Sequence, residues 1–112
     1  MSKFIVSPEA ERDLDIIKSY PLRQAGSRVT RHIFRQLRAG MRVVAQNPAA
    51  GHVRDDLAEG WPVKFWPVFS YLIVYEPHRK PVTIARVLHG SRDVGEILSY
   101  RSGSGSGAAT KD

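Results

Sequence analysis

Apolar residues near the start of the chain recur at helical spacing. Ala10, Leu14 and Ile17 are separated by four and three residues, which predicts one buried stripe on a helix. The preceding Ser7-Pro8-Glu9 offers a hydroxyl cap, a proline suited to the first helical turn and an acid near the positive end of the helix dipole. We therefore predict a helix from residue 8 to about residue 19, preceded by a short strand over residues 3–7.

A second, longer amphipathic pattern runs from Gly26-Ser27 to Asn47-Pro48. With about 100° per residue, its apolar residues fall on one side. They are Val29, Ile33, Leu37, Met41 and Val44. We expect Ser27 to cap this helix. Gly40 disfavours a helix by about 1 kcal/mol relative to alanine, and we expect it to mark a close approach of the first helix.

Apolar runs in the second half of the chain predict three strands, over residues 63–66, 68–75 and 82–88. The proline-containing stretch 76–81 predicts the turn between the last two strands. Pro67 predicts a bulge or a tight turn between the first two. The remaining predictions are a loop over residues 47–60 and a helical turn over residues 93–98.

Alternation along the middle strand places apolar side chains on both faces of the predicted sheet. One face carries Phe69, Tyr71, Ile73 and Tyr75, and the other carries Val68, Leu72 and Val74 with Ser70. One helical layer covers only one of these faces. We expect the other to be covered either by a protein partner or by residues 93–100 folding back over it.

The element order β-α-α-β-β-β predicts an α+β fold of two layers, in which a helical hairpin packs on a mostly antiparallel sheet. A chain of 112 residues is long enough for one such domain, which we assign to residues 1–100. Residues 101–112 are rich in Ser and Gly, a composition typical of a flexible linker, whether native or added.

Composition excludes several kinds of chemistry. The chain has no Cys, which excludes disulfides, a thiol nucleophile and Cys-ligated zinc. Its four His residues lack metal-binding spacing and no Gly-rich phosphate loop is present, so we expect neither a metal nor a cofactor. No apolar run approaches the roughly 18 residues of a membrane span, and we expect a cytoplasmic protein without membrane contact.

The formal net charge of +6 is concentrated in residues 16–54, which contain eight Lys and Arg residues and no acid. Five of these lie on the second predicted helix at spacings of three and four residues: Arg28, Arg31, Arg35, Arg38 and Arg42. One interpretation is a solvated face that Asp13 and Asp15 of the first helix partly cover. The other is an anion-binding surface for an acidic protein segment or for nucleic acid.

Four stretches of the chain carry a family resemblance. They are residues 7–14 (Ser-Pro-Glu-Ala-Glu-Arg-Asp-Leu), Asn47-Pro48 with Gly51, Arg54 and Asp56-Leu57, residues 71–75 (Tyr-Leu-Ile-Val-Tyr) and residues 84–93 (Ile-Ala-Arg-Val-Leu-His-Gly-Ser-Arg-Asp). In this order they resemble the ParE branch of the RelE/ParE toxins of bacterial toxin–antitoxin modules. The resemblance covers about residues 3–98, and the family has the element order predicted above.

This resemblance implies a toxin that an antitoxin of the ParD type neutralises in a hetero-oligomer. ParE-type toxins are known to poison DNA gyrase and so to stop replication, whereas the RelE branch cuts messenger RNA on the ribosome. One fold hosts both activities, so the fold alone does not decide between them. The antitoxin-binding residues we expect are the five arginines of the second helix together with Trp66 and Tyr71.

A RelE-type nuclease needs polar side chains that polarise a phosphate and move a proton. By the resemblance, Leu72 and Leu98 stand where it has an arginine and a C-terminal tyrosine, while Lys64 and Arg92 match. His89 would substitute as acid or base. We therefore favour gyrase inhibition without catalysis, and keep a ribonuclease using Lys64, His89 and Arg92 as the alternative.

Arg86 and His89 each have two interpretations. Arg86 lies in mid-strand, where a charge is costly unless it is paired or exposed. It either pairs with an acid or joins His89 and Arg92 in a target-binding face. The acids considered for that pair are Asp55, Asp56 and Glu76. His89 either belongs to that face or simply ends the strand and caps the following turn.

Overall fold

The computed structural model of the chain describes residues 3–19 and 21–99. Its elements are β1 (Phe4–Val6), α1 (Pro8–Ser19), α2 (Pro21–Ala25), α3 (Ser27–Gln46), the 3-10 helix η1 (Pro48–Ala50), β2 (Lys64–Val68), β3 (Tyr71–Glu76) and β4 (Val82–His89). Residues 94–99 form one further helical segment. The predicted Ser/Gly-rich tail over residues 101–112 lies outside the described residues.

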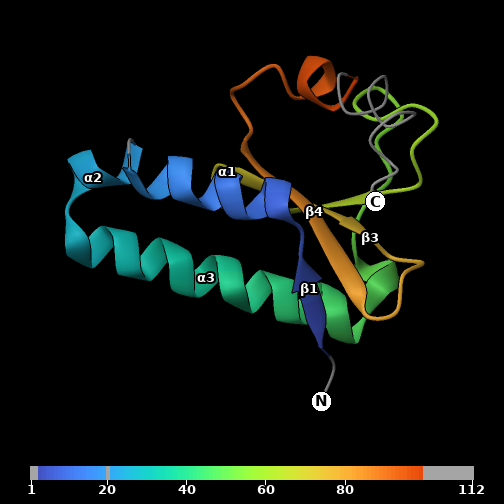
Figure 1. The fold of residues 1–112 in the computed structure, drawn as a ribbon, viewed down its shortest axis with the longest axis horizontal. Helices are drawn as coiled ribbons and strands as arrows, with labels where there is room; N and C mark the ends of the chain where they lie inside the picture. The colour runs from blue at the N-terminus through green and yellow to red at the C-terminus, as the bar shows by residue number, and fades with distance from the viewer. Residues whose placement is uncertain (1–2, 20, 100–112) are drawn as a thin grey trace.

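The strands form a sheet in the order β1-β4-β3-β2. β3 is antiparallel to both β2 and β4, while β1 runs parallel to β4. α1 and α3 form a helical hairpin joined by α2, and α3 packs on one face of the sheet (Figure 1). The predicted fold class, an α+β fold with a helical hairpin on a mostly antiparallel sheet, is confirmed.

Ser7 fixes the start of α1 and its place beside β4. Its hydroxyl accepts the backbone N–H of Ala10 at 3.1 Å, which confirms the predicted cap. The same hydroxyl donates to the carbonyl of Ala85 at 2.9 Å, and the Ser7 N–H donates to the carbonyl of Ile84 at 3.0 Å. Because β1 pairs with β4 only as far as Ile84, Ser7 continues the pairing of an edge that would otherwise be open.

The pattern of the sequence does not predict α2. Pro21 begins it, at a position where the missing N–H costs no helical bond, and the Leu22 side chain is buried in the core. The predicted cap of α3 by Ser27 is wrong, because Gly26 occupies the cap position at φ 96° and no side chain caps the helix. The Thr30 hydroxyl is within hydrogen-bonding distance of the Gly26 and Leu22 carbonyls, at 2.8 and 3.0 Å.

The core between α3 and the sheet confirms the apolar stripe of the second helix. Leu37, Met41 and Val44 are buried and pack against Tyr71, Ile73 and Tyr75 of β3. Val29, at the first position of the stripe, is 42% exposed. The buried part of the stripe therefore lies in the second half of α3.

Gly40 marks a close approach, but the neighbour is the sheet and not the first helix as predicted. A Cβ atom at this position would lie 2.9 Å from Val68 Cγ2, 3.1 Å from Ile73 Cδ1 and 3.2 Å from Trp66 Cδ1. The glycine lets the α3 backbone lie directly on β2 and β3, which outweighs its low helix propensity.

Pro67 does not form the predicted bulge or turn and lies inside β2. β2 is an edge strand, where a residue without an N–H is tolerated. Val68 pairs with Tyr71, which leaves Phe69-Ser70 as a two-residue turn. The turn places Val68 on the same face as Tyr71, opposite to the prediction, because strand alternation does not continue through it.

The other face of the sheet is covered from within the chain. A second apolar cluster joins residues of β2, β3 and β4 to the segments before β2 and after β4. Its buried members are Ala58, Val63, Phe65, Val74, Leu88, Val94 and Leu98. Residues 94–99, orange-red in Figure 1, lie on the side of β4 away from α3. Of the two predicted covers for this face, the folded-back C-terminal segment is the one found.

Candidate functional site

The outward side of α3 is a row of exposed arginines, which we call the arginine face: Arg28, Arg31, Arg35, Arg38 and Arg42. The predicted separation of this row from the apolar stripe is confirmed, because Leu37 and Val44 are buried on the other side of the helix. The prediction that acids of α1 cover these arginines is wrong for Asp13, because its carboxylate contacts Arg86 of β4 instead. Within residues 3–19 and 21–99, the ion pairs found involve other arginines.

Arg86, which is partly exposed, forms an ion pair with the buried Asp13 of α1. Its Nε and Nη2 donate to the two carboxylate oxygens at 2.8 and 3.0 Å, and the Val87 N–H donates to Oδ2 at 3.0 Å. The hydrogen bond to Asp13 raises the pKa of Arg86. The prediction that Arg86 pairs with Asp55, Asp56 or Glu76 is wrong, because the acid found beside Arg86 is Asp13. Asp56 pairs with Arg54 and Glu76 pairs with Arg79 instead.

The second candidate region is the end of the sheet where β2 turns into β3 and β4 ends, which we call the sheet tip. His89 is the last residue of β4, and its Nδ1 accepts the Ser91 N–H at 3.1 Å and lies 2.7 Å from the Ser91 hydroxyl. The ring of Tyr71 packs against His89 edge-on, with centroids 5.1 Å apart. His89 thus ends the strand and holds the following turn, as one of its two interpretations predicts.

A shallow cavity of about 360 Å³ lies at the sheet tip. Pro67, Phe69, Ser70, Tyr71, Leu72, His89, Gly90 and Ser91 line it. Arg92 follows directly and is exposed. Of the predicted target-binding residues, His89 and Arg92 are therefore brought together at this tip, whereas the guanidinium of Arg86 is engaged by Asp13.

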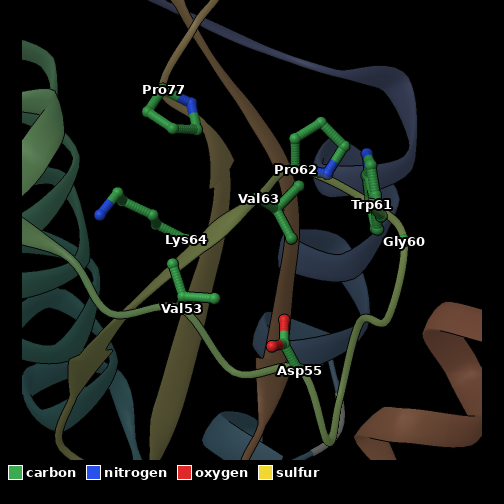
Figure 2. A pocket seen from close by; sticks show the side chains of 8 residues that line it. All are labelled: Val53, Asp55, Gly60, Trp61, Pro62, Val63, Lys64 and Pro77. Atoms are coloured by element: carbon green, nitrogen blue, oxygen red, sulfur yellow. The ribbon is translucent and has the colours of Figure 1, made fainter.

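Lys64 lies in a different place, beside a cavity of about 510 Å³ at the start of β2 (Figure 2). The lining residues are Val53, Asp55, Gly60, Trp61, Pro62, Val63, Lys64 and Pro77. The Lys64 side chain points away from the Asp55 carboxylate (Figure 2). The lining is mainly apolar, and it gathers no set of groups that would both polarise a phosphate and move a proton.

The loop that leads to this cavity is tied to the core by Tyr75. The phenol of Tyr75 donates to the carbonyl of Pro48 at 2.7 Å and accepts the N–H of Gly51 at 2.8 Å. Burial raises the pKa of Tyr75, so the neutral phenol that can donate is favoured. A Cβ atom at Gly51 would lie 2.5 Å from the Tyr75 hydroxyl, which explains glycine at this position.

The structure does not assemble the three residues predicted for a nuclease. Lys64 pairs with Tyr75, and His89 pairs with Tyr71. Their pairing positions are therefore four residues apart along β3, about 13 Å at roughly 3.3 Å per residue, and β3 itself lies between the two strands that carry them. Leu98, at the position where the resemblance implies a catalytic tyrosine, is 1% exposed and packs under the sheet.

Trp66 and Tyr71, predicted to bind a partner, belong to the core under α3. Tyr71 is 5% exposed and Trp66 is half-buried against the same cluster. Little of Tyr71 is therefore available for contact with another protein.

Sequence reasoning named Asp13 and Phe69 but missed the role that each has in shaping the candidate surfaces. Asp13 lies on the buried side of α1 with Ala10 and Ile17, so its position among apolar residues signalled a buried partner. Phe69 is 61% exposed at the sheet tip with φ 54°. A two-residue turn without Asn or Gly was the available signal for a strained position.

Within the part of the chain that the structure describes, no cluster of three or more His, Asp or Glu residues could hold a metal ion. None of the helices described is both long and apolar enough to cross a membrane.

Comparison with known families identifies the family to which this chain is similar. The model of the ParE toxin of type II toxin–antitoxin systems, parDE, matches residues 4–94. The matched range includes β1 to β4, α1 to α3, the arginine face and the sheet tip. A search of curated proteins finds no match. The family match confirms the resemblance drawn from the sequence.

Proposed function

We propose that this chain, which belongs to the ParE toxins of type II toxin–antitoxin systems, inhibits DNA gyrase and so blocks replication. Toxins of such systems have an antitoxin partner. We take this partner to be of the ParD type, and to form a hetero-oligomer with the toxin in the cytoplasm, where its target works.

The observation that carries this proposal is the separation of Lys64 from His89. A nuclease of the predicted kind needs Lys64, His89 and Arg92 at the same phosphate, and of these only His89 and Arg92 lie close together. Lys64 and His89 lie on opposite sides of β3, and their pairing positions are four residues apart along it. Leu98 is buried where a tyrosine would be needed. Inhibition through surface contact requires no such set of groups, and it is therefore the function that this arrangement supports best.

We assign target contact to the sheet tip and to the arginine face. His89 and Arg92 are adjacent to the exposed turn that carries Phe69. The ring of Phe69 in turn contacts His32 of α3, so the arginine face borders the same end of the sheet. Arg86 contributes indirectly, because its bidentate bond to Asp13 holds α1 against the strand that ends in His89.

The antitoxin would silence the toxin by covering the arginine face. Five exposed like charges without acids on the same helix are complementary to an acidic segment of the antitoxin, as they are to other anions. A partner bound there would exclude the target from the same surface. Antitoxin and target are therefore proposed to compete.

A supercoiling assay with purified gyrase tests the proposal. Relaxed plasmid, ATP and gyrase are incubated with the full chain, and the products are separated before and after protein denaturation. We expect loss of supercoiling and accumulation of cleaved plasmid, both reversed by adding the cognate antitoxin first. Normal supercoiling at toxin excess, together with cleaved messenger RNA in a translation reaction, would replace this proposal with the ribonuclease.

A further inference from the structure

The arginine face forms a straight cationic row of defined length. Arg28 and Arg42 are fourteen residues apart, so the row extends about 21 Å at roughly 1.5 Å per residue. All five arginines are exposed, and none belongs to the ion pairs found among the described residues. No acid lies anywhere on α3. Their charges are therefore available to an anion with repeated negative groups.

Phe69 adds an aromatic ring beside this row. It is 61% exposed and held at φ 54°, a left-handed conformation that is unfavourable for a bulky side chain. Its ring lies against His32 of α3, with centroids 5.7 Å apart and planes inclined at 46°. His32 is one helical turn from both Arg28 and Arg35, so the ring borders the arginine face.

We propose that the arginine face and Phe69 together bind DNA, with the arginines on the phosphates of one strand and Phe69 stacked on an unpaired base. At roughly 3.4 Å of rise per nucleotide, the value for a stacked strand, the row matches at most about six nucleotides. Arginine rows beside exposed aromatic rings are the groups that bind single-stranded nucleic acid. This inference rests on the proposed function in one respect, since the DNA would be the segment that gyrase holds open.

For the toxin that is free of its antitoxin, the surroundings of the row favour DNA over an acidic protein as the ligand. Tight protein partners need buried apolar anchors, whereas nucleic-acid affinity comes mainly from cation–phosphate contacts. The apolar stripe of α3 is turned into the sheet. The exposed valines of α3, Val29 and Val43, are fourteen residues apart and form no common groove. The outward side of α3 thus offers charges with a single aromatic ring.

Fluorescence anisotropy of the purified full chain tests the proposal with a labelled oligothymidine of about twelve nucleotides, twice the span of the row. We expect tighter binding to the single strand than to a duplex of equal length. The affinity should fall with salt by a log–log slope of about −0.7 per phosphate contacted. Arg31→Gln, Arg35→Gln and Arg38→Gln combined should make this slope shallower by about 2.

A matched variant distinguishes the effect of the arginine face on DNA affinity from the effect of net charge. Arg12→Gln, Lys18→Gln and Lys80→Gln combined also remove three exposed positive charges, but none lies on the arginine face. We expect this variant to bind almost as the parent does. Equal losses in the two triple variants, or no binding of either DNA at low salt, would overturn the proposal.

Phe69→Asn tests the contribution of stacking to DNA affinity without destabilising the fold. Asn tolerates the left-handed conformation better than Phe, so the melting temperature should be unchanged or higher. The affinity for the single strand should nevertheless fall about tenfold, through loss of stacking. Unchanged affinity would remove Phe69 from the site and contradict this part of the proposal.

Two further outcomes are decisive. Arginine-dependent binding of an oligoglutamate peptide without binding of DNA would assign the face to an acidic protein and overturn the proposal. DNA binding by a chain that leaves gyrase fully active would support this site and reject the proposed function. Failure of the site is therefore distinguishable from failure of the proposed function.

Discussion

At the scale of single residues, Asp13 and Arg86 show how a sheet charge is accommodated. Asp13 is 5% exposed and its carboxylate accepts three hydrogen bonds, two from Arg86 and one from the Val87 N–H. A buried charge of this kind is tolerated only when it is paired and hydrogen-bonded. The pair also joins α1 to β4 past Ile84, where the pairing of β1 with β4 ends. We therefore assign it a structural role.

Asp13→Ala should lower the free energy of unfolding by about 3–5 kcal/mol, because it leaves Arg86 unpaired and the Val87 N–H without its acceptor. Urea unfolding followed by circular dichroism measures this. Asp15→Ala, an exposed acid two residues along α1, is the control and should change stability by less than about 0.5 kcal/mol.

A double-mutant cycle completes this test. Asp13→Leu with Arg86→Met should cost much less than the sum of the two single changes, because no unpaired charge remains. Additive losses, or equal losses for the alanine changes at positions 13 and 15, would contradict the role assigned to the pair.

At the scale of elements, periodicity predicted what lies on either side of each helix better than it predicted their ends and connections. The α3 stripe and the arginine face follow from one repeat of about 3.6 residues, and both are found on the predicted sides of the helix, although Val29 at the start of the stripe is exposed. α2 escaped prediction because five residues are too few to show a period. Pro67 was misplaced because its tolerance depends on β2 being an edge strand, which strand order decides and the local sequence does not.

Leu37→Ala tests the helix layer. Leu37 is 1% exposed within the core under α3, so its truncation should cost about 2–5 kcal/mol in free energy of unfolding. Val29→Ala is the matched control on the same stripe. Val29 is 42% exposed, and its truncation should cost well under half as much. Equal costs would mean that the two halves of α3 are buried alike.

At the scale of the whole molecule, the site was predictable where it depends on one element and unpredictable where it depends on several. The arginine face lies on one helix, and the sequence alone identifies it. The sheet tip joins the β2–β3 turn to the end of β4, and α3 contacts it through the rings of His32 and Phe69. The distance between Lys64 and His89 likewise needs the strand register, which brings them to opposite ends of β3. Resemblance to a family could name these residues but could not place them.

Growth arrest on induction tests which of the two activities the whole molecule performs. His89→Gln removes the imidazole that a nuclease would use to transfer a proton but keeps a polar group beside Ser91. For a toxin that acts by contact, arrest should persist. For a nuclease with His89 as acid or base, the rate should fall by about 10²–10⁴-fold and arrest should be lost.

Arg92→Ala should weaken arrest more than His89→Gln, because Arg92 is exposed at the proposed contact surface.

Toxin abundance decides how each of these results is interpreted. Arg86→Ala breaks the bond to Asp13, so its loss of arrest should be accompanied by a loss of protein. Arg92→Ala and the control Arg12→Ala should both leave abundance unchanged, and only Arg92→Ala should weaken arrest. If His89→Gln abolishes arrest at normal abundance and the parent chain leaves purified gyrase active, then proton transfer and not surface contact is what the sheet tip provides.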